Sequence, residues 1–404
     1  MSHAEQEMHP VVSSLTFWQR IMCRWADRIA VGRLTLQFEG YGEHVAIGAK
    51  PGPNAVLCVR NASPVLRLLT GGTLGFAQSF MDGDLDSPDI GAVLELALSN
   101  EAQLGAVLAS SSLFKALARL RHKLRRNSKK GSRRNIAYHY DLGNAFYGLW
   151  LDQTMTYSSA LFRTGQESLE KAQEQKYASM VDQMGAKPGD HVLEIGCGWG
   201  GFAEYAAAKR GLKVTGLTIS KAQHDYAVAR IAAAGLSDRV EIKLQDYRDE
   251  KGVYDGIASI EMFEAVGEKY WPTYFNTLRE RLKPGAQATL QIITIADDRF
   301  AMYRKTVDFI QKYIFPGGML PSPSALKAEI ARAGLEFTGS IEFGQSYSQT
   351  LRRWHDTFNA RWSEAQAMGF DDRFRRMWNM YLTSCAGAFQ GGNCDVTQVT
   401  LKRP

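Results

Sequence analysis

The sequence predicts an α/β fold, in which a mostly parallel sheet with helices on both faces follows a smaller N-terminal α+β domain. Between residues 191 and 295, short apolar segments alternate with helical ones, which is the pattern of βαβ units. The first apolar segment runs into a glycine-rich turn that opens a helix, as in nucleotide-binding sheets. The length of 404 residues exceeds one ordinary core, so we expect a second domain.

The alternation defines the expected elements of the sheet. Strands are predicted at His191–Gly196, Leu212–Leu217, Arg239–Leu244, Tyr254–Ile260 and Ala288–Ile295, with helices at Gly200–Lys209 and Lys221–Ala234. Ligands of such sheets bind beyond the carboxyl ends of the strands, near the point where the strand order reverses. We therefore expect the functional residues close to Gly196, Thr218, Asp246 and Glu261.

The smaller domain is expected over residues 1–126 and the larger one over residues 127–404. Three segments with turn residues between them predict a small α+β module: the helix-like Thr16–Ile29 and the alternating Leu34–Glu39 and Ala55–Arg60. The boundary is placed at the polar stretch Asn127–Ser132, which has no apolar residue.

A basic block precedes this boundary. Ten lysines and arginines and no acidic residue lie between Lys115 and Arg134, which is more than the whole net charge of +6. Such a block attracts a polyanion, either nucleic acid or the anionic face of a bilayer, unless it is only a solvated linker. Leucines recur beneath the charges at helical spacing, at positions 113, 117, 120 and 124. A basic amphipathic helix of this kind favours an anionic membrane surface, and we expect no nucleic-acid partner.

The remaining composition indicates a cytoplasmic protein. No stretch approaches the roughly 18 apolar residues of a membrane span, and residues 1–10 are polar, without a signal-peptide core. The five cysteines are odd in number and scattered, which argues against a disulfide framework. The eight histidines show no metal-ligand spacing, so we expect no metal site.

The glycine-rich turn indicates the cofactor class. Residues 192–201 read VLEIGCGWGG, with the spacing Glu-x-Gly-x-Gly-x-Gly in place of the Gly-x-Gly-x-x-Gly of dinucleotide sites. This segment resembles motif I of S-adenosylmethionine (SAM)-dependent methyltransferases. The resemblance implies that Glu194, Gly196, Gly198 and Gly200 form the floor of the SAM site. A tight turn without a ligand is the alternative.

Further cofactor contacts are expected at the ends of the next two strands. Thr218 and Gln223 can hydrogen-bond the ribose hydroxyls as neutral groups, although Thr218 could instead cap the following helix. Asp246 can accept a hydrogen bond from the adenine amine while Tyr247 packs on the ring, the alternative being a surface turn.

Four longer segments carry a more specific resemblance. They are His139–Asn144 (HYDLGN), Met155–Ala160 (MTYSSA), Ser259–Gly267 (SIEMFEAVG) and Tyr313–Pro321 (YIFPGGMLP). Together they resemble the cyclopropane-fatty-acyl-phospholipid synthase family, which includes mycolic acid cyclopropane synthases and lipid methyltransferases. The resemblance implies an enzyme with the Rossmann-like class I methyltransferase fold, and it adds Tyr157 and Ser158 to the SAM site.

The family reaction transfers the methyl(ene) carbon of SAM to the cis double bond of an unsaturated fatty acyl chain in membrane phospholipid and forms a cyclopropane. We expect this reaction, with the protein peripherally associated with the inner face of the membrane. A methyl-branched or methylene fatty acid is the alternative outcome within the family. A small-molecule N-methyltransferase and a non-enzymatic lipid-transfer protein are rival interpretations. Whether the chain forms a homodimer stays open.

Attack on the double bond leaves a carbocation on the acyl chain, which aromatic faces can stabilise. The aromatic residues near the four segments are Tyr140, Phe146, Tyr157, Phe263, Tyr313 and Tyr347, and plain packing is the alternative role for each of them.

In the family, a bicarbonate ion is the base that removes a proton from the added methyl group. By resemblance, Glu264 and Tyr347 match two of its ligands, while Ser159 stands at the cysteine position and can still donate a hydrogen bond. The histidine position reads Ile293, which makes a bound bicarbonate doubtful. Glu261 replaces a family glycine, and we hypothesise that its carboxylate acts as base or electrostatic partner in place of the anion; the alternative is a salt bridge or a supporting acid.

Two further catalytic residues are carried over from the resemblance. His139 comes from the first of the four segments, and Cys385 matches a cysteine traditionally assigned to the active site. Nothing in the chemistry requires a thiolate, so a structural role for Cys385 is the alternative.

Overall fold

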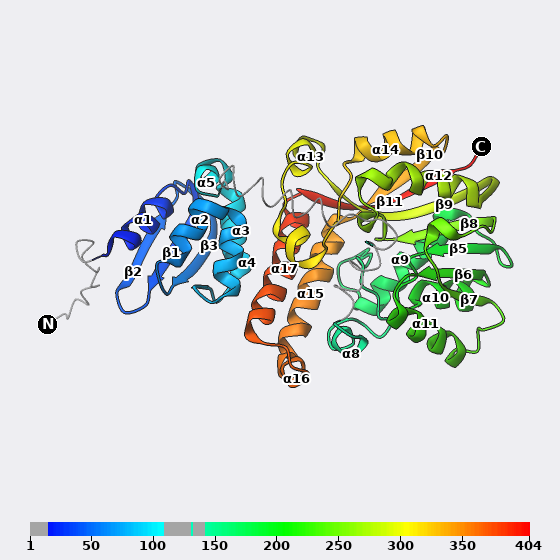
Figure 1. Ribbon diagram of the computed structural model, residues 1–404, viewed down its shortest axis with the longest axis horizontal. Helices are drawn as coiled ribbons and strands as arrows, with labels where there is room; N and C mark the ends of the chain where they lie inside the picture. The colour runs from blue at the N-terminus through cyan, green and yellow to red at the C-terminus, as the bar shows by residue number, and fades with distance from the viewer. Residues whose placement is uncertain (1–14, 109–130, 132–141) are drawn as a thin grey trace. The chain divides into compact units, whose positions relative to one another are not determined.

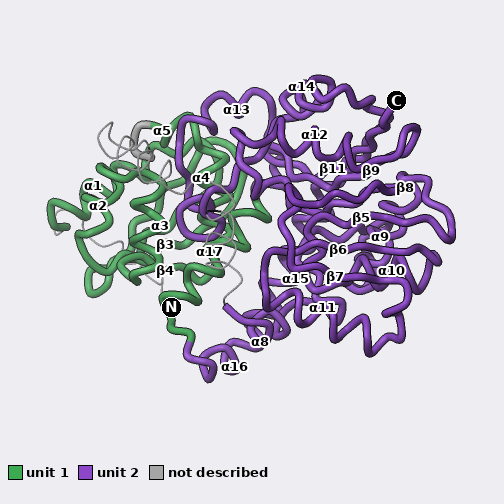
Figure 2. The backbone as a smooth tube through the Cα atoms, turned by 45° about the vertical axis from the view of Figure 1, so that its right-hand side comes forward, with its two compact units in different colours: residues 1–118, 370–387 green, residues 119–369, 388–404 purple. Residues whose placement is uncertain are grey.

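The computed structural model describes residues 15–108, 131 and 142–404, which fall into two compact units (Figures 1 and 2). Unit 1 comprises residues 1–118 and 370–387, and unit 2 comprises residues 119–369 and 388–404. The predicted domain boundary, the predicted basic helix and His139 all lie outside the described residues. No local pattern predicts that residues 370–387 belong with the N-terminal part of the chain.

Unit 2 is built on a seven-stranded sheet of order β10-β11-β9-β8-β5-β6-β7 (Figure 1). Its strands are β5 (His191–Ile195), β6 (Lys213–Thr218), β7 (Val240–Leu244), β8 (Tyr254–Ile260), β9 (Leu282–Ile295), β10 (Glu336–Glu342) and β11 (Cys394–Lys402). Strands β5 to β9 pair in parallel, whereas β11 runs antiparallel to both β9 and β10. The strand order reverses between β5 and β8, so the segments that follow these two strands meet at the edge where ligands bind.

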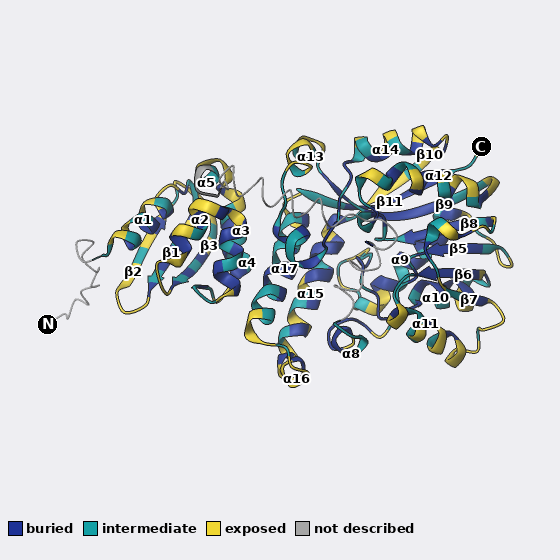
Figure 3. Ribbon diagram, in the orientation of Figure 1, coloured by how far each residue is buried: buried dark blue, intermediate teal, exposed yellow. Residues whose placement is uncertain are grey.

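Helices cover both faces of this sheet. They are α9 (Leu169–Met184), α10 (Gly201–Arg210), α11 (Lys221–Ala233), α12 (Trp271–Arg281), α14 (Pro323–Arg332) and α15 (Gly344–Ala360). Successive strand residues point to opposite faces, so Val192 packs with α9 and α10 while Leu193 packs with α12 and α14. The central strands are therefore buried on both sides, as Figure 3 shows. This confirms the predicted fold class.

The five predicted strands and two predicted helices are present, most of them within one residue of the expected bounds. The exception is β9, which begins at Leu282, six residues before the predicted Ala288. Smaller elements of unit 2 are α8 (Asn144–Tyr147), η2 (Tyr247–Asp249), η3 (Phe263–Ala265), η4 (Glu268–Tyr270), α13 (Asp297–Tyr303), the π-helical η5 (Ile310–Ile314) and α16 (Trp362–Ala367).

Unit 1 contains a four-stranded sheet of order β2-β1-β3-β4, in which β1 and β3 are parallel. Its elements are α1 (Phe17–Ala26), β1 (Val31–Phe38), β2 (Gly42–Ile47), β3 (Lys50–Val59), α2 (Ser63–Gly71), α3 (Thr73–Met81), β4 (Leu85–Asp86), α4 (Ile90–Ser99) and α5 (Glu101–Leu108). Most of α17 (Asp372–Gln390) also belongs to this unit. Arg376 holds it there by donating to both carboxylate oxygens of Asp86, each at 3.0 Å.

Within the described part of the chain, no helix has the length and apolar character needed to cross a bilayer. Nor do three or more His, Cys, Asp or Glu side chains gather there in a way that could hold a metal ion.

Candidate active site

The glycine-rich turn joins β5 to α10, and three of its glycines have left-handed backbone angles. Gly196, Gly198 and Gly200 have φ values of +86°, +51° and +85°. A Cβ on Gly196 would lie 2.7 Å from Cγ of Met262, whereas a Cβ on Gly198 would meet nothing within 4 Å. The turn is thus tightly packed beneath Gly196, and there is open space beside Gly198.

The carboxylate of Glu194 lies just before this turn and is 2% exposed. Its Oε2 is buried and has no hydrogen-bond partner in the described structure. Burial raises the pKa of Glu194 to about 8, and the ammonium group of Lys176 opposes this shift. A buried acceptor without a donor beside an open turn fits a ligand that brings hydroxyl or amine groups, as SAM does.

Thr218 ends β6 and Gln223 lies in the first turn of α11, and the two side chains are in contact. Thr218 donates a hydrogen bond from Oγ1 to Oε1 of Gln223 at 2.9 Å, and both side chains are buried. The idea that Thr218 caps the next helix is wrong, since Ser220 is the N-cap residue and accepts from the backbone N–H of Gln223. Both side chains remain available as neutral groups for ribose hydroxyls.

Asp246 follows β7 and is 3% exposed. Arg248 donates to both of its oxygens, from Nε at 2.7 Å and from Nη2 at 2.6 Å. The guanidinium group also lies over the ring of Tyr247 at 5.5 Å and over that of Tyr270 at 5.7 Å. The segment is therefore an ordered, ion-paired turn, and the sequence analysis had missed the part played by Arg248.

Tyr157 lies in a group of aromatic rings. Its ring centroid is 5.4 Å from those of Tyr147, Trp150 and Trp354, and 6.4 Å from that of Phe315. The negative faces and positive edges of such rings attract one another, and the same faces can stabilise a positive charge.

Glu261, directly after β8, has a φ of +48°, which is a left-handed conformation that normally favours glycine. Its Oε1 accepts hydrogen bonds from the backbone N–H of Ser159 at 2.8 Å and from Nε2 of Gln291 at 2.7 Å. Its Oε2 accepts from the hydroxyl of Tyr347 at 2.7 Å. Three donors from three separate segments thus converge on this one carboxylate.

These contacts bring together three residues that the sequence analysis had proposed: Glu261, Ser159 and Tyr347. Ser159 takes part through its backbone N–H and not through its hydroxyl, which donates to the carbonyl of Ala160 instead. Its side chain is therefore not the donor that we had expected.

Glu264 lies beside this group, in η3. Its Oε1 accepts from the backbone N–H of Ile293 at 2.6 Å, while its Oε2 is buried without a partner in the described structure. Burial and the neighbouring charge of Glu261 raise the pKa of Glu264 to about 8, so its carboxyl group carries a proton at neutral pH. Ile293 thus supplies a donor from its backbone although its side chain has none.

Two side chains of α9 donate hydrogen bonds to Ser158. Lys176 donates from Nζ to the hydroxyl of Ser158 at 2.7 Å, and Gln173 donates to its carbonyl at 3.0 Å. Lys176 is fully buried, and the sequence analysis had missed it. A signal was present, because Lys176 interrupts the apolar face formed by Ala172, Met180 and Met184.

The other predicted residues lie elsewhere. Cys385 lies on the part of α17 that belongs to unit 1, whereas the carboxylates described above belong to unit 2. Phe263 is 1% exposed and packs against Trp271 and Phe275 in the core, so packing explains it. Tyr313 packs against Phe309 with ring centroids 5.5 Å apart.

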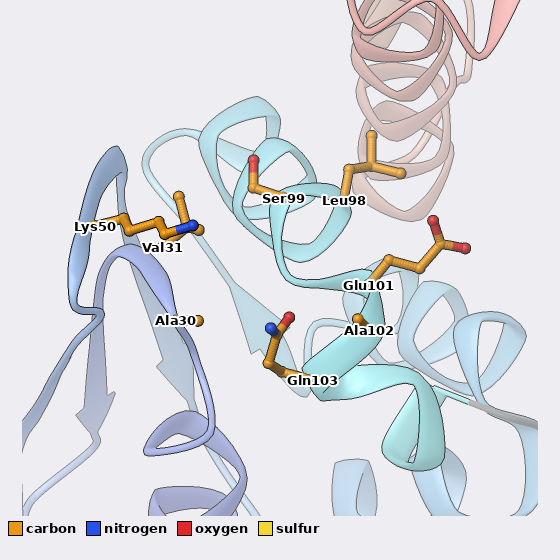
Figure 4. A pocket seen from close by; sticks show the side chains of 8 residues that line it. All are labelled: Ala30, Val31, Lys50, Leu98, Ser99, Glu101, Ala102 and Gln103. Carbon is orange, nitrogen blue, oxygen red and sulfur yellow. The ribbon is translucent and has the colours of Figure 1, made fainter.

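Unit 1 has a separate pocket, which is lined by Ala30, Val31, Lys50, Leu98, Ser99, Glu101, Ala102 and Gln103 (Figure 4). Asn100 lies within the same segment, but its side chain is fully used in hydrogen bonds to the backbone of Ala30, Val31 and Leu96. The lining contributes one lysine and one glutamate, and these do not form a catalytic arrangement.

Comparison with known proteins identifies the family. The family model for mycolic acid cyclopropane synthetase matches residues 127–399. The chain belongs to this family.

Among its relatives, tuberculostearic acid methyltransferase UfaA1 of Mycobacterium tuberculosis is 38% identical over 90% of this chain and 87% of its own. Cyclopropane-fatty-acyl-phospholipid synthase of Escherichia coli is 36% identical over 85% of this chain and 87% of its own. The solved structure of mycolic acid cyclopropane synthase CmaA1 complexed with SAH and CTAB covers 67% of this chain and 97% of its own, with 30% identity and a TM-score of 0.63.

The chain is therefore a SAM-dependent methyltransferase of a family that modifies lipids. The open turn beside Gly198 and the unpartnered oxygen of Glu194 fit this cofactor. When bound, SAM supplies an electrophilic methyl group on a positively charged sulfur.

Proposed function

We propose that this enzyme adds a methyl group to the cis double bond of an unsaturated fatty acyl chain in membrane phospholipid, and that Glu261 accepts the proton released. The observation that carries the proposal is the convergence of Ser159 N–H, Gln291 and Tyr347 on the Glu261 carboxylate. By resemblance, Ser159 and Tyr347 stand at positions that hold a bicarbonate ion in the family. The chain's own carboxylate takes the place of that ion.

The surroundings of this carboxylate suit the chemistry. Addition of a methyl group to an alkene uses the π electrons for the new C–C bond and leaves a positive charge on the neighbouring carbon. The rings around Tyr157, Trp150 and Trp354 offer π faces to that charge. Trp150 and Trp354 are almost fully buried, so they also keep water away from a cation that water would trap.

The lifetime of the cation decides the product. Rapid loss of a proton from the new methyl group closes a cyclopropane ring. Slower loss lets a hydride shift from the methylated carbon to its neighbour, which gives a more stable tertiary cation. That cation then loses its proton to form a methylene or internal alkene.

Burial raises the pKa of Glu261, and its three donors oppose this rise, so the carboxylate is a weaker base than burial alone would make it. We therefore infer that the open-chain methylene product is favoured, and that a saturated methyl branch forms only if a separate reductant acts on it. The relationship to tuberculostearic acid methyltransferase supports a methylated product. Cyclopropane formation is the second candidate, supported by the 36% identity to the Escherichia coli synthase.

The decisive experiment uses SAM labelled at its methyl carbon and vesicles that contain a cis-monounsaturated, anionic phospholipid. Both products gain one CH2 group and have the same mass, so proton and carbon NMR of the released fatty acids must separate them. Vinylic methylene signals support the open-chain product, and cyclopropane ring signals overturn it in favour of the second candidate. Label that enters only added small amines, and no acyl chain, refutes lipid methylation.

We further propose that the protein binds the anionic inner face of the membrane. The basic block at residues 115–134 supports this. So does α1, where Phe17, Arg20 and Arg24 are exposed on one face while Met22 and Cys23 are buried on the other. Cosedimentation with anionic vesicles that weakens as salt increases supports this proposal, and equal binding to neutral vesicles contradicts it.

A further inference from the structure

Lys176 is an unusual residue for the interior of a protein. It is 0% exposed on the apolar face of α9, although lysine is almost never fully buried without a charged partner. Its ammonium donates one hydrogen bond, to the neutral hydroxyl of Ser158, and lies 4.6 Å from the ring centre of Tyr177. Neither contact neutralises its charge.

The compensating charges come from three other segments of unit 2. Burial lowers the pKa of Lys176, and attraction to Glu261, then to Asp152 and Glu194, opposes this shift. The carboxylate of Asp152 already accepts hydrogen bonds from the backbone N–H and the hydroxyl of Thr154. Among the three, the electrostatic effect of Glu261 is the largest.

The same lysine is connected to Glu261 through the backbone. Lys176 and Gln173 hold Ser158 by its hydroxyl and its carbonyl, and the next residue, Ser159, donates its N–H to Glu261. The helix α9 therefore acts on this carboxylate twice, through the position of a donor and through a charge.

Besides Lys176, the titratable groups that face Glu261 are Glu264 and Tyr347. Glu264 is protonated at neutral pH and adds no charge there, and the Tyr347 hydroxyl donates to Glu261. Lys176 is the cation whose charge opposes the effect of burial on Glu261. Without it, burial would favour the protonated form of Glu261, which cannot accept a proton.

We propose that Lys176 is a positioning residue whose buried ammonium keeps the Glu261 carboxylate ionised. This inference rests on the proposed function, in which Glu261 takes the proton released from the methylated acyl chain. Lys176 acts only through Glu261 and Ser158 and touches no reacting atom. A nearby opposite charge favours the ionised form of a carboxyl group, so removing it has a measurable effect.

Two variants separate charge from hydrogen bonding. Lys176→Gln keeps a donor for Ser158 but removes the charge, and Lys176→Met removes both. The matched control is Lys171→Met on the same helix, because Lys171 is exposed and pairs with Glu174. The rate of methyl transfer to vesicle phospholipid is measured from pH 5 to pH 9 for each.

For both Lys176 variants we expect the acid limb of the pH profile to move upward by at least one pH unit. Activity at neutral pH then falls at least tenfold and recovers at high pH, while the control profile stays unchanged. A Lys176→Gln profile that is unmoved, or lowered equally at every pH, overturns the proposal.

A second measurement needs neither cofactor nor substrate. Thermal unfolding is followed across pH for the wild type, Lys176→Gln, Glu261→Gln and the double variant. Loss of the ammonium raises the pKa of folded Glu261 further, so folded protein holds a proton that unfolded protein releases, and stability falls as pH rises. Burial lowers the pKa of Lys176 to about 7, so the comparison is made below pH 7, where its ammonium is present. In that range we expect the Tm deficit of Lys176→Gln to grow with pH, and to lose this pH dependence when Glu261 is also glutamine.

A deficit that is the same at every pH overturns the effect of the Lys176 charge on Glu261, whatever the activity data show. If the wild type transfers no methyl group to acyl chains, the proposed function fails, yet the unfolding measurements still decide whether Lys176 supports the charge of Glu261.

Discussion

Replacing Glu261 by glycine should convert the enzyme into one that needs an external anion. The substitution removes the carboxylate but keeps its three donors, which are Ser159 N–H, Gln291 and the Tyr347 hydroxyl. It also restores glycine at a backbone position with a φ of +48°. The vacated space, lined by donors, then matches the anion site that the family resemblance implies.

The energetic consequences have opposite signs. Relief of the left-handed conformation stabilises the variant by about 1 kcal/mol. Each donor left without an acceptor costs about 1–3 kcal/mol, so an empty site loses at least about 2 kcal/mol overall. Bicarbonate at ten times its dissociation constant returns about 1.4 kcal/mol. For a domain of this size, that corresponds to a Tm increase of about 3 °C.

The assay compares Glu261→Gly with the wild type in CO2-free buffer and in bicarbonate, by thermal unfolding and by methyl transfer to vesicles. We expect bicarbonate to raise both the Tm and the rate of the variant and to leave the wild type unaffected. Because the bound anion then replaces Glu261 as the base, we also expect the ratio of cyclopropane to open-chain product to change. Equal Tm, rate and product in the two buffers would show that Glu261 does not occupy an anion site.

Three further outcomes are expected. Tyr347→Phe removes a donor from the Glu261 carboxylate and raises its pKa, so methyl transfer at neutral pH should fall about tenfold and partly recover at higher pH; a pH-independent loss contradicts this. Burial and the charge of Glu261 raise the pKa of Glu264 to about 8, so folded protein holds a proton between the ordinary carboxyl range and pH 8 and its stability falls across that interval. Because the pKa of Glu194 is raised in the same way, Glu264→Gln should reduce this fall in a series of Tm values, and an unchanged fall contradicts the expectation. Gly196→Ala places a Cβ 2.7 Å from Met262 at a φ of +86°, and calorimetry should show at least a tenfold loss of SAM affinity.

The sequence was sufficient to predict which residues lie at the ends of the central strands. Parallel strands carry continuous apolar runs, and the residues that follow them gather at one edge of the sheet. That reasoning placed Gly196, Thr218 and Glu261 correctly at strand ends. The family resemblance added Tyr347, which no local pattern connects to Glu261 because 86 residues separate the two.

The contacts that could not be predicted are of two kinds. Backbone donors leave no trace in residue identity, so Ile293 looked unable to replace a histidine although its N–H reaches Glu264. Burial that depends on contacts between distant segments cannot be predicted from local sequence either. Lys176 resembles any other polar residue of a helix, and only the packing of α9 against the sheet buries it. The joining of residues 370–387 to unit 1 likewise depends on the pairing of Arg376 with Asp86, which are 290 residues apart.

The presence of Glu261 in place of the family glycine, directly after β8, thus links backbone strain to the proposed proton transfer. A residue other than glycine at a φ of +48° persists only if its side chain gains more than the backbone loses. Glu261 gains three hydrogen bonds to an anionic group, each worth more than a neutral bond. Those bonds also oppose the rise in pKa that burial causes, because every donor that stabilises the carboxylate makes it a weaker acceptor of the next proton. The interactions that make glutamate tolerable at this position therefore slow proton removal, and slow proton removal gives the acyl cation time to rearrange.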